Sequence, residues 1–343
     1  MQKIRRLKKQ KPVALFACSP VKFGGWVSYT VHLFSALKDQ GYEPRLFRIT
    51  KKSEARPRPY ADGISYRNIS LADAWSTCKR WNRAIVTYAA WKDCKDVLPA
   101  LLDAGAGIVL HDPTEFHKDL LSSIGKSKVV VIRPANKEAL STIGIESSFI
   151  PHPYVPPLEV PKLNVSMHAV SYSRVDFDKG THLICEANKN LAPEKRCTIY
   201  GALNRIYAFH KLDKEYDWRK EYMGKFPAGP GNAVALAESS DLVVDMSTIK
   251  GDGGGTQYTF LEAWQSGTPL IVNRGWLMQS DRTMEHRRNC YAVENATELR
   301  LVLSEGLDPW LLKQISQGGK DSLLETHSPK PIASAFREAM GWE

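Results

Sequence analysis

Short apolar runs alternate with amphipathic stretches from one end of this 343-residue chain to the other. Continuous apolar runs predict buried strands, and apolar residues three or four apart predict helices. In the first half the predicted strands are Val13–Cys18, Pro44–Ile49, Ala84–Tyr88, Gly107–His111 and Lys128–Ile132. Several of these runs are apolar throughout, as strands of a parallel sheet are. The alternation predicts an α/β fold with doubly wound sheets covered by helices on both faces.

Five prolines between residues 151 and 161 interrupt the pattern, and a second alternation follows them. It predicts strands at 169–173, 196–200, 242–245 and 270–272, and helices at 181–188, 234–239, 258–266, 299–305, 309–325 and 332–340. A chain of this length exceeds one hydrophobic core. We therefore expect two similar Rossmann-like domains facing a cleft, at 1–155 and 163–328, with C-terminal helices capping the second. Residues 329–343 form a last helix that can pack back on the first domain.

Composition excludes several classes of protein. No window of 18 apolar residues exists, so no spanning helix is predicted. The six cysteines are scattered without a CxxC pair, which favours free thiols over disulfides or a zinc site. We expect a soluble, monomeric, cytoplasmic protein (in the host cytoplasm if the chain is viral).

Positive charge is concentrated near the N-terminus. The net charge is +10, and residues 1–60 alone hold 14 lysines and arginines against three acidic residues. This asymmetry predicts a polyanionic partner, either nucleic acid or an anionic membrane surface, although a solubilising basic tail would give the same count. The segment from Lys51 to Tyr60 is stiffened by prolines, so we expect an exposed loop. Its candidate contacts to DNA are Lys51, Lys52, Arg56, Arg58 and Tyr60.

A glycine-rich turn, residues 250–257, follows an apolar strand and opens a predicted helix. Backbone amides in such a turn can approach an anion at the positive end of the helix. No GKS or GKT follows the glycines, so a Walker loop is excluded. The alternative is a merely flexible loop with a solvent-facing Glu262.

A second turn lies between Ser173 and Gly180, again just past a predicted strand. Its Arg174 and Lys179 could converge on a diphosphate, because Arg offers a fork of donors and Lys a point charge. Near the N-terminus, Gly24 and Gly25 join the first strand to the first helix, where backbone can approach an anion or a second substrate.

His111 and Asp112 end a strand of the first domain, at the edge where open α/β sheets bind ligands. Asp112 could act as a base, a nucleophile or a charge stabiliser, and His111 could contact a sugar hydroxyl. Alternatively, Asp112 merely caps the helix that starts near Pro113.

Together these residues resemble the donor half of a GT-B glycosyltransferase of the family-4 type. The resemblance implies that Arg174 and Lys179 hold the diphosphate of a nucleotide sugar, that the glycine turn holds phosphate and sugar, and that Glu262 holds the ribose. The chain departs from the family at Gly254, where a first glutamate is usual, and Asp252 is the candidate substitute. The donor-binding residues implied are Gly24, Gly25, Arg174, Lys179, Asp252, Gly253, Gly254, Gly255, Thr256, Tyr258 and Glu262.

Within GT-B enzymes the chain is similar to the T-even phage DNA glucosyltransferases, through residues 258–262, Gly24–Gly25 and the pair His111–Asp112. That resemblance implies transfer of glucose from UDP-glucose to a hydroxymethyl-pyrimidine, such as 5-hydroxymethylcytosine, in bacteriophage DNA. His111 and Asp112 are then the catalytic candidates, and both retention and inversion stay open. A base inside a duplex must be flipped out, and the aromatic candidates for filling its place are Trp26, Trp75, Trp81 and Tyr60.

No metal-ligand cluster is apparent, so we expect no tightly bound cofactor, with Mg²⁺ at most stimulating the reaction. Two alternatives remain. The first is a GT-B transferase acting on a lipid-linked or cell-envelope glycan, with the basic N-terminus on anionic lipid. The second is a non-catalytic module that binds a nucleotide sugar or DNA.

Overall fold

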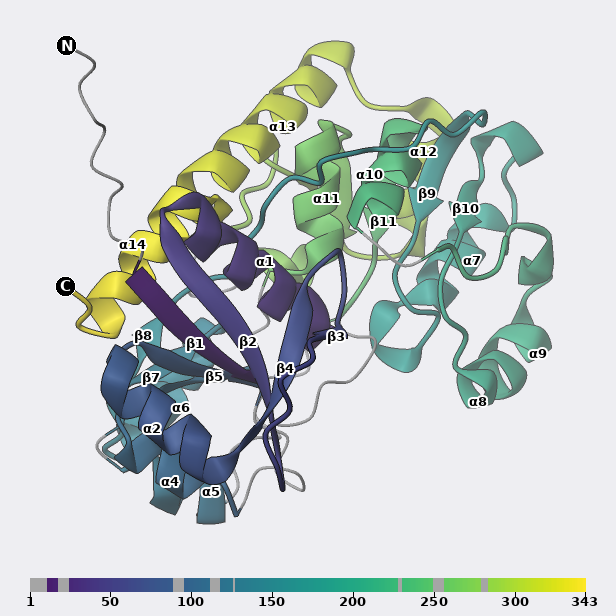
Figure 1. Ribbon diagram of the computed structural model, residues 1–343. Coiled ribbons are helices and arrows are strands. Elements are labelled where there is room, and N and C mark those ends of the chain that lie inside the picture. The colour runs from purple at the N-terminus through teal and green to yellow at the C-terminus, as the bar shows by residue number, and fades with distance from the viewer. Residues whose placement is uncertain are drawn as a thin grey trace, which may run out of the picture. The chain divides into compact units, whose positions relative to one another are not determined.

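The computed structural model describes residues 11–17, 25–88, 96–111, 118–125, 127–227, 230–248, 256–278 and 283–343. The chain divides into two compact units, one formed by Met1–Val155 with Ser328–Glu343 and the other by Pro156–His327. Each unit is built on a largely or wholly parallel sheet (Figure 1). The predicted α/β class is thereby confirmed.

The first unit contains an eight-stranded sheet in the order β3-β4-β2-β1-β5-β6-β7-β8. The strands are β1 (Lys11–Ala17), β2 (Tyr42–Thr50), β3 (Arg58–Pro59), β4 (Ser65–Ser70), β5 (Ala84–Tyr88), β6 (Gly107–Leu110), β7 (Val129–Val131) and β8 (Ser148–Phe149). All neighbouring pairs are parallel except β3 with β4. Because β1 lies between β2 and β5, the strand order reverses there, and open sheets bind ligands beyond the carboxyl ends at such a point.

Helices cover both faces of this sheet, as Figure 1 shows. They are α1 (Gly25–Asp39), α2 (Leu71–Trp81), α4 (Leu98–Asp103), α5 (Lys118–Ile124), α6 (Pro134–Thr142) and α14 (Pro329–Ala339). The main core lies between the sheet and α2, α4, α5 and α6, while α1 and α14 pack together on the other face. The C-terminal residues are held by side chains of the first unit: Lys128 donates to the Met340 carbonyl, and Lys11 and Arg83 donate to Glu343.

The second unit contains a five-stranded parallel sheet in the order β10-β9-β11-β12-β13. Its strands are β9 (Met167–Ser171), β10 (Cys197–Ile199), β11 (Ser240–Asp245), β12 (Leu270–Asn273) and β13 (Tyr291–Val293). Its α-helices are α7 (Thr181–Asn188), α8 (Arg205–Tyr207), α9 (Asp213–Glu215), α10 (Pro230–Glu238), α11 (Tyr258–Ser266), α12 (Ala296–Glu305) and α13 (Pro309–Ser322). Shorter helical turns are η2 (Phe177–Lys179), η3 (Pro193–Lys195), η4 (Ala208–Leu212), η5 (Trp218–Lys220), η6 (Arg274–Met278) and η7 (Leu323–His327).

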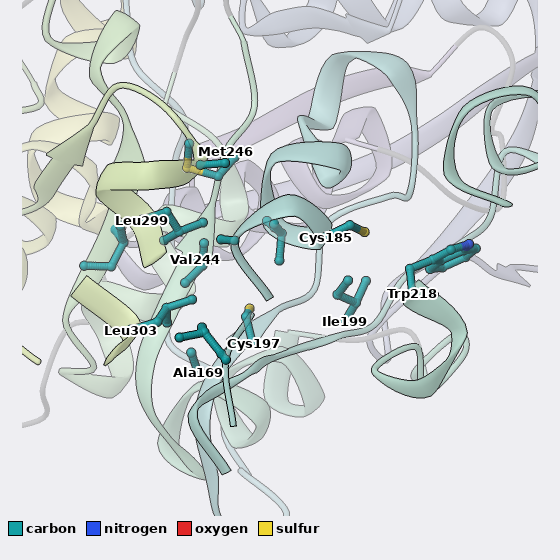
Figure 2. Close-up of a cluster of buried hydrophobic side chains, with 14 of the residues drawn as sticks. Ala169, Cys185, Cys197, Ile199, Trp218, Val244, Met246, Leu299 and Leu303 are labelled. Atoms are coloured by element: carbon teal, nitrogen blue, oxygen red, sulfur yellow. The ribbon is translucent and has the colours of Figure 1, made fainter. Parts of the chain in front are cut away.

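The core of this unit joins its sheet to α7 and α12 (Figure 2). Strand side chains Ala169, Cys197 and Val244 pack with Leu299 and Leu303 of α12. The four cysteines described, Cys78, Cys185, Cys197 and Cys290, are all free and buried. Burial raises the pKa of the Cys185 and Cys290 thiols to about 12, which disfavours the nucleophilic thiolate form.

The segment predicted as an exposed loop between Lys51 and Tyr60 is partly a strand. Arg58 and Pro59 pair antiparallel with Tyr66 and Ser65 at the edge of the sheet. Proline is acceptable there because the free side of an edge strand needs no amide donor. Residues 51–59 are exposed, as the sequence predicts, whereas Tyr60 is half-buried.

Candidate functional site

The carboxyl end of β9 leads into a turn that is fixed against the end of β11. Asp176 caps the start of this turn, accepting a hydrogen bond from the Phe177 amide at 2.8 Å. Gly180 adopts a left-handed conformation (φ +59°), and a side chain there would meet the carbonyl of Met246. The Thr248 amide donates to the Asp178 carbonyl at 3.0 Å. The turn therefore has little freedom to change shape.

The two predicted cations of this turn have different surroundings. Arg174 is exposed, and its guanidinium pairs with Asp176 at 2.8 Å and Asp178 at 3.5 Å. Lys179 instead donates from Nζ to Oε1 of Gln257 at 2.5 Å. Gln257 is the residue before α11, and no side chain caps that helix start. The structure thus brings Lys179 to the positive end of α11, where an anion would be stabilised.

Glu262 lies on α11, one turn beyond its start. It is half-buried and makes no hydrogen bond or ion pair with any residue the structure describes. Burial among protein atoms raises the pKa of its carboxyl well above the ordinary value. An enclosed carboxyl without a partner is costly, and sugar hydroxyls would supply the donors it lacks.

The other predicted residues around this helix are only partly described. Thr256 is buried, with Oγ1 at 3.5 Å from Oγ1 of Thr283, and Tyr258 is the first residue of α11. Asp252, Gly253, Gly254 and Gly255 lie outside the described residues, as does Gly24. Gly25 begins α1, with open space where a side chain would be.

In the first unit, His111 follows the end of β6 and is buried. Its Nε2 lies 2.7 Å from the Thr87 carbonyl oxygen on the neighbouring strand β5. Because a carbonyl can only accept, Nε2 carries the hydrogen in this contact. The ring packs edge-on against Tyr29 of α1, with centroids 4.7 Å apart. Asp112 lies outside the described residues.

The sequence analysis did not identify Thr87, although this residue makes two contacts near His111. Besides its carbonyl, its hydroxyl accepts from Oγ1 of Thr30 on α1 at 3.1 Å. The ring of His111 is therefore held by a strand end that is itself tied to a helix. A threonine inside an apolar strand carries no signal of this role.

The predicted DNA contacts fall at the edge of the first unit's sheet. Lys51, Lys52 and Arg56 are exposed and form no ion pair with any described residue. Arg58 differs, because its guanidinium pairs with Glu54 at 2.7 Å. Tyr60 packs edge-on against Tyr66, with centroids 6.3 Å apart.

Two observations bear on metals and membranes. Among the described residues, no three His, Cys, Asp or Glu side chains gather as metal ligands would. In the same part of the chain, no helix has the length and apolar character needed to cross a membrane.

Solved structures that match this fold include GT-B glycosyltransferases. HepE of Anabaena, solved with UDP and glucose, matches with a TM-score of 0.68 at 14% identity, over 97% of this chain and 100% of that one. An α-glucosyltransferase solved with UDP-glucose and DNA containing an abasic site matches with a TM-score of 0.70 at 13% identity, with the same coverage. A sucrose-phosphate synthase from Thermosynechococcus elongatus matches with a TM-score of 0.67 at 14% identity, over 97% and 100%.

No known protein family matches the sequence, and neither does any curated protein. At these identities the similarity establishes the fold, and the predicted GT-B architecture is confirmed.

Proposed function

We propose that this chain is a glycosyltransferase that uses a UDP-sugar and transfers glucose to a hydroxymethyl-pyrimidine in DNA. The main support for a donor site is Glu262. Its carboxyl is enclosed and has no partner among the described residues, and Lys179 contacts the start of the helix on which it lies. Neighbours of the same fold were solved with UDP or UDP-glucose.

Donor binding follows from the charges at the ends of β9 and β11. Lys179 and Arg174 stabilise the negative charge that grows on the diphosphate as it leaves, an electrostatic role. Arg174 must exchange its contacts with Asp176 and Asp178 for the phosphates, which its exposure allows. Glu262 accepts hydrogen bonds from the ribose hydroxyls. Mg²⁺ can add to this stabilisation but carries no required step.

The acceptor half uses His111 and Asp112. With Nε2 donating to Thr87, the imidazole is oriented by the protein. In this proposal Asp112 acts on the anomeric carbon or on the acceptor hydroxyl. If Asp112 removes the acceptor proton, the anomeric configuration inverts; if it only stabilises charge, retention is open.

DNA is favoured as acceptor by the charge of residues 1–60 and by Lys51, Lys52 and Arg56, which form no ion pair with any described residue. Exposed cations suit the phosphate backbone, whose neutralisation dominates affinity. One neighbour of the same fold was solved with DNA.

The test is a donor and acceptor cross-assay. Radiolabelled UDP-glucose is offered with 5-hydroxymethylcytosine DNA, 5-hydroxymethyluracil DNA and unmodified DNA, with and without EDTA. We expect salt-sensitive label transfer to one modified DNA, lost in Asp112→Ala and largely kept in EDTA. The anomeric configuration of the product, read by NMR, then decides between retention and inversion.

Other outcomes separate the alternatives. Hydrolysis of UDP-glucose without transfer to any DNA would keep the donor site and move the acceptor to envelope glycans. Absence of turnover with every nucleotide sugar would contradict the enzyme assignment and favour a binding module.

A further inference from the structure

The outer side of α2 in the first unit carries cations stacked on two tryptophans. Lys79 Nζ lies 5.4 Å from the ring centroid of Trp75. Arg45 and Arg80 place their guanidinium carbons 5.4 and 6.0 Å from the ring centroid of Trp81. We call these five residues the α2 basic face.

The burial pattern of α2 explains why Trp75, Lys79 and Arg80 point outward, while Trp81 is half-buried and packs against the core. Ala74, Thr77 and Cys78 face the core and are buried. Trp75 therefore lies on the solvent side, and 40% of its surface is exposed. Large aromatic side chains normally bury most of their area, so Trp75 presents an apolar ring that the fold itself does not need.

The positive charge of this face is only partly neutralised. Arg45 pairs with Glu43, but Arg80 forms no ion pair with any described residue. Lys79 donates to the backbone carbonyl of Asp103 at 3.1 Å. Cations in the last turn of a helix do stabilise its dipole, and Lys79 and Arg80 serve α2 in that way. That role does not account for an exposed tryptophan beneath one of them.

The segment of exposed cations that follows β2 contacts the first turn of α2, whereas Lys79 and Arg80 lie in its last turn. Ser53 of that segment donates to the carboxylate of Asp73 in the first turn of α2, and accepts from the Ser70 amide at 2.8 Å. Asp73 is the only acidic residue of α2, and it is occupied by these serines and the helix cap. This contact of Ser53 ties the segment that holds Lys51, Lys52 and Arg56 to the start of the same helix.

We propose that the α2 basic face is a second contact surface for DNA, in addition to residues 51–58. The proposal rests on DNA being the acceptor. Its cations contact backbone phosphates, and Trp75 offers a flat ring to sugar or exposed bases, a combination typical of nucleic-acid surfaces. An anionic membrane fits less well, because an anchor needs several apolar residues to insert, and on α2 the only large apolar side chain described as exposed is Trp75.

The test compares Lys79→Glu/Arg80→Glu with a control of equal charge change in the second unit, Lys189→Glu/Lys313→Glu. Affinity for an unmodified duplex is measured by fluorescence anisotropy over a range of salt concentrations. We expect the α2 variant to bind about tenfold more weakly at low salt. Its salt slope should be shallower by about 1.8, because each phosphate that the protein no longer neutralises lowers the slope by about 0.9. UDP-glucose hydrolysis stays at the wild-type rate in both variants.

Two milder variants guard against misfolding. Lys79→Gln/Arg80→Gln keeps the helix polar and should make the slope equally shallow, because neutral side chains do not displace counterions from phosphates. Trp75→Ala, measured with a single-stranded oligonucleotide, should weaken binding about threefold without changing the slope, since stacking of the ring on exposed bases is not ionic. Thermal unfolding curves check that each variant is folded.

The remaining outcomes are decisive. Equally weakened binding in the second-unit control would mean that only net charge matters, which overturns the proposal. If the wild type binds DNA and the α2 variants bind it equally well, the proposal is overturned while the proposed function stands. A wild-type chain that binds no DNA removes both together. The wild type could instead bind phosphatidylglycerol vesicles and not DNA. If Lys79→Glu/Arg80→Glu abolishes that binding, the partner is a membrane and the proposal is overturned.

Discussion

The strand ends of the second unit and the basic edge of the first unit carry charge in opposite ways. In the second unit a few charged groups are enclosed and fixed: Lys179 is held by Gln257, and Glu262 is half-buried without a partner among the described residues. In the first unit Lys51, Lys52 and Arg56 are exposed, and no described residue pairs with them.

The difference indicates two kinds of ligand. Enclosed groups in fixed positions suit one small anionic ligand with a defined shape, because their interactions are weakly screened and need no reorganisation. Exposed, mobile side chains suit a polyanion of repeating charge, where salt screening is strong and no single interaction dominates. Four predictions test that contrast, from the largest expected effect to the smallest.

Replacing Lys179 with methionine should lower the turnover of UDP-glucose about 10²- to 10³-fold, the usual effect of removing one charge-stabilising donor. Lys52→Met serves as the control and should leave hydrolysis of UDP-glucose unchanged. Steady-state kinetics of both variants check this. Equal decreases in the turnover of UDP-glucose by the two variants would contradict the proposed difference between the two regions.

Replacing Gly180 with alanine should destabilise the protein by about 2–4 kcal/mol, because a left-handed backbone and a backbone clash act together. The added Cβ would meet the Met246 carbonyl. Gly144→Ala is the matched control, since that glycine also has positive φ (+77°) at a helix end but open space around it. Its cost should be about 1 kcal/mol, from the backbone alone. Denaturant unfolding compares them, and similar values would mean that the turn is not packed tightly on β11.

Replacing Glu262 with glutamine should weaken UDP binding about 10- to 100-fold, because hydrogen bonds to a charged group are among the stronger ones. The same change should stabilise the ligand-free protein at neutral pH. The pKa of Glu262 is raised in the folded state, so folding disfavours its ionised form. Its stabilising contribution is full below the ordinary carboxyl pKa and is lost as pH rises through the folded value.

Melting temperatures of the wild type and of Glu262→Gln, measured without ligand across the acidic and neutral range, check this sign. The two curves should meet at low pH and separate as pH rises, with the variant higher. A variant that melts lower at neutral pH would mean that the carboxylate has a stabilising partner.

Reversing the charge of Lys51, Lys52 and Arg56 should raise the KM for modified DNA about tenfold and make its salt dependence shallower by about 2.7 per log unit, near 0.9 for each phosphate. The kcat and the KM for UDP-glucose should stay unchanged. A fall in kcat instead would place these cations in the catalytic step and contradict their role as a docking surface.

Sequence patterns identify the parallel strands well, because a strand buried on both faces must be apolar over its whole length. The strand Ser65–Ser70 escaped prediction, since only Tyr66 and Ile69 are large and apolar in it. It is a strand because it pairs with β2 and Arg58–Pro59, which are tertiary contacts without a local signal.

The candidate site shows the same limit. The turns that follow predicted strands could be found from their glycines and charged residues, because these signals are local in the sequence. The contact between Lys179 and Gln257 joins residues 78 positions apart and depends on β9 lying beside β11 in the sheet. The pairing of Arg174 could have been anticipated, since Asp176 and Asp178 follow it within four residues.

Calorimetric titration of UDP into the wild type, Glu262→Gln and the variant Lys51→Glu/Lys52→Glu/Arg56→Glu tests the central claim most directly. The account predicts one UDP site, weakened about tenfold or more by Glu262→Gln and unchanged by the three charge reversals. No UDP binding to the wild type, or equal binding to all three proteins, would contradict a nucleotide-sugar site at the start of α11.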